Sequence, residues 1–186
     1  MIGTISLLAL GAIVIPFVVA LIIVVAPQPC AKWLCIGAAS VSTALTIAVW
    51  AMLAQNGGET VTVALASMGN ATILSLIFDK MSVMLATAFV GIGLLISIYS
   101  VGYMNAGNRE HPDAPRRRFY AFFTVFIGAM AGLVYSDTLV CQLVFFEITG
   151  ACSWALIGYY GTPTANKSAM KALILTHIGA LGLYIA

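Results

Sequence analysis

The hydrophobic residues of this chain fall into long runs that are separated by short polar stretches. The runs cover residues 2–26, 33–53, 80–104, 119–135, 136–160 and 165–186. A helix needs about 20 apolar residues, within a range of about 17 to 25, to cross the hydrocarbon core of a bilayer. A membrane barrel would instead show alternating segments of about 10 residues. The pattern therefore predicts an all-α polytopic membrane protein with about six transmembrane helices.

The pattern changes between the second and the third run. Residues 60–63 and 72–76 are rich in β-branched side chains and alternate in part, and Gly69 and Asn70 stand between them. Two such segments around a turn signal predict a short extracytoplasmic β-hairpin. The chain then divides into an N-terminal helix pair with its strand pair, residues 1–78, and helices three to six, residues 79–186.

Small residues mark the places where helices are expected to pack closely. Gly91 and Gly93 lie in the third run, and the sequence GAMAG at 128–132 lies in the fourth. Small side chains at this spacing let neighbouring helix backbones approach. Pro16 is expected to bend the first helix.

The composition supports a membrane protein and excludes several other classes. Hydrophobic residues make up 62% of the chain and charged residues 8%, whereas a soluble domain carries about 25% charged residues. The net charge of +2 is too small to suggest nucleic-acid binding. The four cysteines show no C-x-x-C pair and are interpreted as free, small packing residues. They are Cys30, Cys35, Cys141 and Cys152.

Basic residues predict the orientation of the helices in the membrane. With six spans, one side of the membrane receives Lys32, Arg109, Arg116, Arg117, Arg118 and Lys167. Lys80 falls on the other side. Because cytoplasmic loops carry the excess of Lys and Arg, the N-terminus and the strand pair are expected outside a bacterial or archaeal cytoplasmic membrane. The arginine run is interpreted as an anchor in a solvated inner loop, with a docking patch for cytoplasmic subunits as the alternative.

Glu147 is the residue that most needs an explanation. It lies near the middle of the apolar run 136–160, where a charged side chain costs about 2.5–3.5 kcal/mol on insertion scales. Small residues follow it on the same helix face at Gly150 and Ala151, so this face is expected to point into a helical bundle. We interpret Glu147 as a proton-carrying group; the alternative is a protonated glutamate that only holds a neighbouring helix.

Two further polar side chains accompany Glu147 in the last run. Counted from the inner helix ends, His177 is expected at a depth similar to that of Glu147, and Lys171 about 10 Å in. The three residues form a candidate ladder for proton transfer through buried groups and water. The alternatives are a Lys171 that reaches the inner surface and a neutral His177 that is hydrogen-bonded within the bundle.

The sequence contains none of the common motifs for catalysis, nucleotide binding or metal binding. No P-loop, G-x-S-x-G elbow, H-E-x-x-H motif or C-x-x-C ligand pair occurs, so no metal, cofactor or catalytic constellation is expected. The chain is expected to be a non-catalytic membrane subunit.

Two longer blocks carry a family resemblance. The segment from RFYAFF to ALIGYY, residues 118–160, and the segment SAMKALILTHIGALGLYIA, residues 168–186, resemble the antiporter-like membrane subunits. These subunits occur in respiratory complex I, multi-subunit cation/proton antiporters and membrane-bound nickel-iron hydrogenases. The sequences IYSVGYMNAGNREHP, FFEITG and LILTHIG look most like component D of the hydrogenase 4 type of formate hydrogenlyase.

The resemblance implies a proton-translocating role coupled to electron transfer in other subunits. It implies that Glu147 works with buried lysines, that Lys171 matches a sixth-helix lysine, and that a lysine of a seventh helix would lie beyond this sequence. The last three helices would begin the first antiporter-like repeat of a longer subunit. The expected partners are other membrane subunits, nickel-iron and iron-sulfur subunits of a hydrogenase, and the lipid bilayer. The alternatives are a subunit of a cation/proton antiporter or of NADH-quinone oxidoreductase, and a structural membrane piece without transport.

Overall fold

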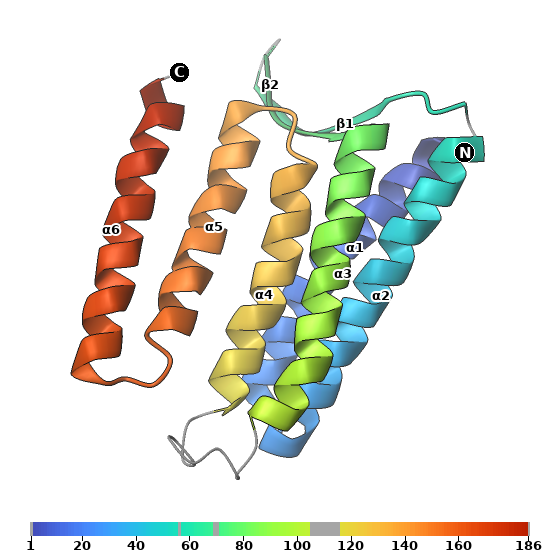
Figure 1. Cartoon of the computed structure of the whole chain (residues 1–186). Coiled ribbons are helices and arrows are strands. Elements are labelled where there is room, and N and C mark those ends of the chain that lie inside the picture. Colours follow the sequence, from blue (N-terminus) through green and yellow to red (C-terminus); the bar gives the residue numbers. More distant parts are fainter. Residues whose placement is uncertain (1, 56, 69–70, 105–115, 186) are drawn as a thin grey trace.

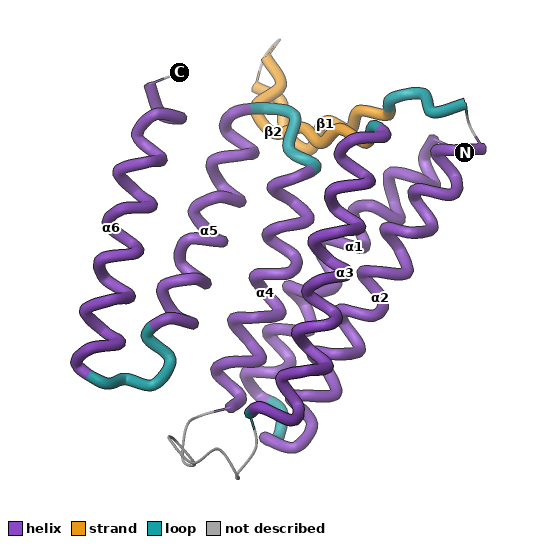
Figure 2. The backbone as a smooth tube through the Cα atoms, viewed as in Figure 1, coloured by secondary structure: helices purple, strands orange, loops and turns teal. Residues whose placement is uncertain are grey.

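Six helices and one strand pair make up the part of the chain that the structure describes. The computed structural model describes residues 2–55, 57–68, 71–104 and 116–185. The helices run up and down in sequence order, and the strand pair lies across one end of them (Figures 1 and 2). The elements are α1 (Ile2–Val25), α2 (Gln28–Gln55), β1 (Val61–Met68), β2 (Ala71–Phe78), α3 (Lys80–Tyr103), α4 (Arg116–Val134), α5 (Leu139–Ile157) and α6 (Pro163–Ile185).

The first four helices form a bundle, and the last two extend from it. Helix α4 packs against α1, α2 and α3, α5 packs on α4, and α6 packs on α5 (Figure 1). Over the described residues, five helices are long and apolar enough to cross a membrane: α1, α2, α3, α4 and α5. The prediction of an all-α polytopic membrane protein is confirmed, and the spanning role of α6 stays a prediction.

Glycines set the distance between several of these helices. A Cβ atom added at Gly132 would clash with the ring of Phe145, so this ring of α5 packs directly on the backbone of α4. At Gly93 the added atom would lie 2.9 Å from Ile127. Gly91 has open space instead. The expected close packing is therefore present at Gly93 and on α4, and absent at Gly91. Pro16 lies inside α1, which continues as one helix.

The strand pair is attached to the turn between α4 and α5. Antiparallel β1 and β2 pair from Val61 with Phe78 to Met68 with Ala71, which confirms the predicted hairpin. The turn then pairs with β2, since the Ile77 amide donates to the Tyr135 carbonyl at 2.8 Å and the Asp137 amide to the Ser75 carbonyl at 3.0 Å. The Ser75 hydroxyl also donates to the Asp137 carboxylate at 2.7 Å. The pairing of Asp137 with β2 was not predicted from the sequence.

Two buried hydroxyl groups inside the bundle donate to carbonyls of their own helices. Ser97 and Thr124 donate to the carbonyls of Gly93 and Tyr120 four residues earlier, each within 2.8 Å. Such bonds remove the cost of an unpaired polar group in an apolar interior. Cys35 is a free, buried cysteine whose sulfur lies 3.6 Å from the Ser97 hydroxyl. The four cysteines are all free, as predicted, and Cys30 is the exposed one.

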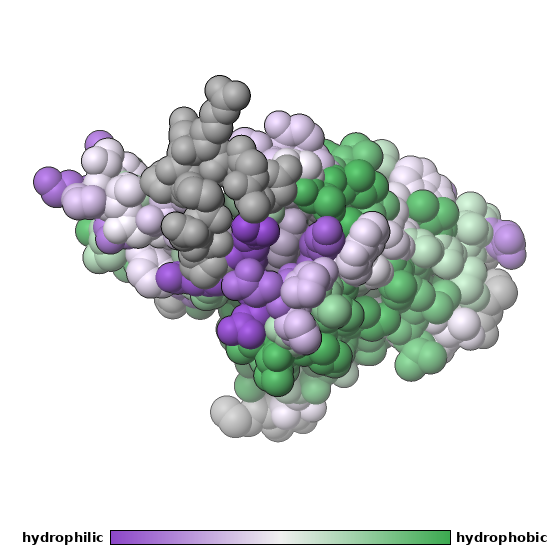
Figure 3. Space-filling view, turned by 90° about the horizontal axis from the view of Figure 1, so that it is seen from below, coloured by the Kyte–Doolittle hydropathy of each residue, from purple (hydrophilic) through white to green (hydrophobic). Residues whose placement is uncertain are grey.

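Basic residues gather at the end of the molecule opposite the strand pair. The beginnings of α2, α4 and α6 lie at this end and carry Lys32, Arg116, Arg117, Arg118 and Lys167 (Figure 1). Figure 3, which looks at this end, shows hydrophilic side chains here and hydrophobic ones on the flanks of the helices. Glu59, Asp79, Lys80 and Asp137 lie at the opposite end, around the strands. Arg109 lies in 105–115, outside the described residues, together with Glu110, His111 and Asp113; the predicted turn Gly69 and Asn70 lies outside them too.

Candidate functional site

Glu147 lies near the middle of α5, as the sequence predicted. The helix begins after Thr138, whose hydroxyl accepts a hydrogen bond from the Cys141 amide at 3.3 Å. It ends at Ile157, before Gly158. About ten residues of helix lie between Glu147 and this end, which corresponds to about 15 Å along the axis. The carboxylate is therefore far from both helix ends.

The structure brings Glu147 and His177 into direct contact. The His177 Nε2 atom of α6 lies 2.8 Å from the Glu147 Oε2 atom of α5. The two side chains thus lie at the same depth between neighbouring antiparallel helices, as the count of residues from the helix ends predicted. A contact of this length is a charge-assisted hydrogen bond when Nε2 carries the proton and the carboxyl group is ionised, and a neutral hydrogen bond when Oε2 carries it.

The other nitrogen of His177 fixes how the pair can be protonated. Its Nδ1 atom lies 2.9 Å from the Leu173 carbonyl oxygen. A carbonyl oxygen only accepts, so this hydrogen bond requires a hydrogen on Nδ1. One further proton is then needed for the contact with Glu147, and it resides either on Nε2 or on Oε2. The geometry therefore defines a single proton position between an imidazole and a carboxyl group.

A small residue on α5 allows α6 to come this close. Gly150 is buried, one turn beyond Glu147, and an added Cβ atom would lie 3.5 Å from the Thr176 methyl group. Thr176 directly precedes His177 in α6. The small residue that follows Glu147 therefore does face a neighbouring helix, as the sequence predicted.

The rest of the Glu147 face is open in the described chain. Val144 and Trp154 are exposed, and Ala151 is exposed as well. The Glu147 side chain is 29% exposed and that of His177 48% exposed. Within the described residues, the pair is thus covered by α6 on one side and uncovered on the other. Among the described residues a neighbouring helix meets this face at Gly150, and the expectation that the whole face points into a bundle stays a prediction.

Lys171 lies on a different part of α6. It is exposed and lines a shallow open groove together with Lys167, Met170 and Ile174. Since six residues correspond to a rotation of about 120° on a helix, Lys171 and His177 cannot both face Glu147. The structure joins two of the three residues of the predicted ladder, and the proton-transfer roles of all three stay predictions. The described residues hold no cluster of His, Cys, Asp and Glu side chains that would bind a metal ion.

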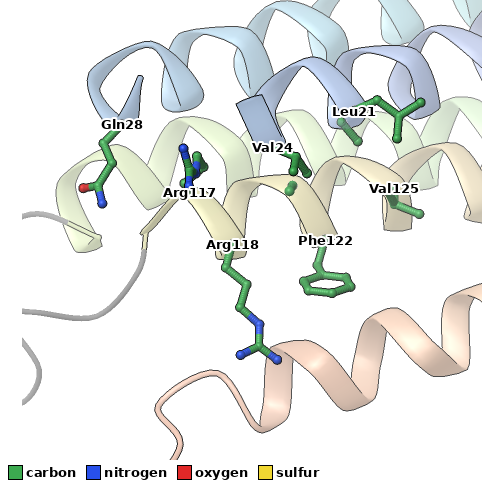
Figure 4. Close-up of a pocket in the computed structure, with 9 residues that line it drawn as sticks. Leu21, Val24, Gln28, Arg117, Arg118, Phe122 and Val125 are labelled. Carbon is green, nitrogen blue, oxygen red and sulfur yellow. The ribbon is translucent and has the colours of Figure 1, made fainter. Parts of the chain in front are cut away.

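Sequence reasoning missed the groove at the basic end of α1 and α4. Arg117, Arg118 and Phe122 of α4 line it opposite Leu21 and Val24 of α1 (Figure 4). The sequence signal was the basic run directly before an apolar helix. The pairing of this run with the end of α1 is a tertiary contact, so no local pattern reveals it.

These features define the class: a multi-pass helical membrane protein with an imidazole–carboxyl contact near the middle of two neighbouring helices. Residues 67–120 match the family model described as NADH-ubiquinone oxidoreductase (complex I), chain 5 N-terminus. The chain is 39% identical over 108 residues to NADH-quinone oxidoreductase subunit L of Mycobacterium tuberculosis. The aligned region covers 58% of this chain and 16% of that protein. The chain is also 31% identical over 153 residues to NAD(P)H-quinone oxidoreductase chain 5 of Synechocystis. This aligned region covers 81% of this chain and 21% of that protein.

The matches support the antiporter-like complex I family that the sequence resembles. A further relative, subunit L of Buchnera aphidicola, is 38% identical over 113 residues, which cover 60% of this chain and 17% of that subunit. The chain thus spans about a fifth or less of the length of these curated relatives. They are named as quinone oxidoreductase subunits, which favours the complex I alternative. The hydrogenase branch is not confirmed.

Proposed function

We propose that this chain carries protons within the membrane arm of a quinone oxidoreductase complex in a bacterial cytoplasmic membrane, with Glu147 as the group that takes up and releases the proton. The observation that carries the proposal is the 2.8 Å contact between Glu147 Oε2 and His177 Nε2. Because the contact places one proton between a nitrogen and a carboxyl oxygen near the middle of two helices, a change in the charges or hydrogen bonds around the pair shifts that proton.

His177 is proposed to act as the partner that holds the proton when Glu147 is ionised. Its Nδ1 hydrogen bond to the Leu173 carbonyl keeps Nε2 directed at the carboxyl group. Proton transfer from Oε2 to Nε2 converts the neutral pair into an ion pair without a movement of heavy atoms. The open side of the pair then gives a further group or water access to this proton. Lys171 lies nearer the basic end of α6 and is proposed as a later carrier on the path towards that end.

Electron transfer is assigned to partner subunits in this proposal, because the relatives are named as subunits of oxidoreductases. A complex with nickel-iron and iron-sulfur subunits of a hydrogenase is the alternative that the sequence blocks suggested. Purification of the complex separates the two: a complex with quinone reductase activity supports the first, and a complex with hydrogenase activity supports the second.

The basic end of the bundle is proposed to face the cytoplasm. Lys32, the arginines of α4 and Lys167 lie there, and the acidic residues Asp79 and Asp137 lie at the strand-pair end. The excess of Lys and Arg on the cytoplasmic side then places the N-terminus outside. Cysteine labelling from either side of sealed vesicles tests this orientation.

Replacement of Glu147 by Gln tests the central role. Glutamine keeps the size and a hydrogen-bonding oxygen but cannot release a proton at neutral pH. We expect the E147Q complex to assemble and to pump fewer protons per electron, measured by dye quenching in liposomes alongside quinone reduction. General acid–base groups contribute typically 100-fold or more to the steps they serve, so the loss is expected to be large.

Two further variants make the test specific. E59Q makes the same change at an exposed glutamate next to β1 and is expected to leave pumping unchanged. H177N is expected to lower pumping, because the asparagine cannot take up the proton that Glu147 releases. Normal pumping by an assembled E147Q complex would leave the pair with a structural role and overturn the proposal.

A further inference from the structure

An apolar groove with two arginines at one end lies between α1 and α4. It encloses about 350 Å³, which falls in the range of about 300–1,000 Å³ that is typical of small-molecule sites. Its walls are Ala20, Leu21 and Val24 of α1 and Ala121, Phe122 and Val125 of α4. Gln28, Arg117 and Arg118 complete the 9 lining residues, none of which is acidic (Figure 4).

The groove opens towards the part of the surface that faces the membrane. Leu21 is 71% exposed and Val24 56% exposed, and both α1 and α4 are long and apolar enough to cross a bilayer. Apolar walls that are open at the side accept hydrocarbon, because lipid tails are as apolar as these side chains. The arginines lie at the end of the groove that is nearest to the membrane surface, where α4 begins.

The two arginines are held in place but keep free donors. The Arg117 Nη1 atom donates to the Ala26 carbonyl at 3.3 Å. The Arg118 guanidinium lies 5.7 Å from the centre of the Phe122 ring, within the range of a cation–π contact. A guanidinium carries five N–H donors. A single bond to a carbonyl or a ring contact therefore leaves several donors for an anion.

The position of these arginines calls for an anionic partner. They lie in the first turn of α4, at the positive end of the helix dipole, where cations are disfavoured and anions are stabilised. A phosphate group there would interact favourably with both guanidinium groups and with the helix end. Basic pockets between transmembrane helices at the cytoplasmic side suit lipid headgroups for the same reason.

We propose that this groove binds one anionic phospholipid, with its phosphodiester on Arg117 and Arg118 and an acyl chain along Leu21, Phe122 and Val125. The site is separate from Glu147 and His177, so its existence does not depend on the proposed proton transfer. Its effect would be to hold α1 and α4 together at the basic end of the bundle.

The test uses the whole complex in vesicles of phosphatidylcholine and phosphatidylglycerol. A trace of photoreactive phosphatidylglycerol, with the reactive group on its acyl chain, is crosslinked, and labelled peptides are identified by mass spectrometry. We expect labelling of α1 around Leu21 and of α4 around Phe122. Photoreactive phosphatidylcholine is expected to label these peptides several times less.

The charge requirement is tested with matched arginine variants. Removal of one basic side chain near an anionic membrane weakens binding roughly fivefold, so R117Q/R118Q is expected to reduce labelling roughly thirtyfold. R116Q is the control, because Arg116 lines a different pocket with Lys32 and Tyr120. Should R117Q/R118Q fail to assemble, L21W keeps both arginines and fills the groove, and it is expected to reduce labelling in the same way.

Three outcomes of the labelling experiment without a competitor overturn the proposal. They are equal labelling by phosphatidylcholine, an equal loss in R116Q, and no labelling of the α1 and α4 peptides in the unmodified complex. The third outcome would mean that the lipid does not occupy the groove in the complex. Competition by millimolar inorganic phosphate would also overturn the lipid assignment in favour of a soluble anion.

Discussion

Gly128 of α4 lies directly against the backbone of α1 at Ile13. A Cβ atom at Gly128 would stand 2.9 Å from the Ile13 carbonyl oxygen and 3.0 Å from the Pro16 Cβ atom. Both neighbours belong to the middle of a helix, and the carbonyl oxygen is part of its backbone. Unlike the end of a flexible side chain, it cannot turn away. The distance between α1 and α4 therefore depends on the absence of a side chain at position 128.

We expect G128A to destabilise the folded protein. Overpacking of a tight interior costs about 1–3 kcal/mol, which outweighs the gain of about 0.5–1 kcal/mol from replacing glycine by alanine in a helix. G91A is the matched control, because an added Cβ atom at Gly91 meets nothing within 4 Å. Thermal unfolding in one detergent should show a lower Tm for G128A and an equal or higher Tm for G91A. Equal Tm values for the two variants would contradict this contact.

Asp79 makes the start of α3 sensitive to pH. The Ser82 amide donates to its carboxylate at 2.8 Å, and the Ser82 hydroxyl accepts from the Asp79 amide at 3.0 Å, which together form a capping box. The hydrogen bonds to Ser82 lower the pKa of the Asp79 carboxyl below 3.8. Because the pKa of Asp79 is lower in the folded protein than in the unfolded chain, the ionised carboxylate stabilises the helix start at pH values above the pKa of the unfolded chain. This stabilisation is lost as the pH falls through the folded pKa.

Hydrogen exchange at the first turn of α3 measures this effect. We expect D79A to speed exchange of the Ser82 amide at pH 7, since loss of such a cap costs about 0.5–2 kcal/mol. D79N keeps a capping oxygen and is expected to remain close to the parent at pH 7, with a smaller acid-induced loss of protection. If D79A leaves the protection of Ser82 unchanged, the cap contributes nothing in the membrane-embedded protein.

Gly150 is expected to control the distance between Glu147 and His177. An added Cβ atom would make an ordinary contact of 3.5 Å with Thr176, so G150A should preserve the pair. G150L places a larger side chain between α5 and α6 and should separate the carboxyl and imidazole groups. We expect fewer pumped protons per electron in G150L and normal pumping in G150A. If an assembled G150L complex pumps normally, the direct contact is not required for pumping.

The prediction of helices from sequence succeeded because hydrocarbon imposes a strict local condition. A run of about 20 apolar residues has few other stable forms in a membrane, since each backbone polar group must be satisfied within the segment. The strand pair was recognisable for a similar reason, since β-branched residues on both sides of a turn favour strands. Its pairing with the 135–137 turn was not predicted, because Ser75 and Asp137 lie 62 residues apart.

The candidate site was predictable in part. Glu147 stood out because a carboxylate deep in an apolar run is costly, and the count of residues placed His177 at the same depth. The choice between His177 and Lys171 as the direct neighbour was left open. It depends on the rotation of α6 about its axis, which the contact of Thr176 with Gly150 helps to define.

The amino-acid sequence by itself determined the class of this protein, the positions of its apolar helices and its strand pair. It also singled out Glu147, whose carboxylate is energetically unfavourable in an apolar run. These follow from the transfer of side chains and backbone from water to hydrocarbon, which depends on local composition. Only the tertiary structure decided which helix faces meet, that His177 and not Lys171 contacts Glu147, and that two arginines close one end of an apolar groove. These relationships depend on the rotation and separation of whole helices, which are set by packing between residues far apart in the chain.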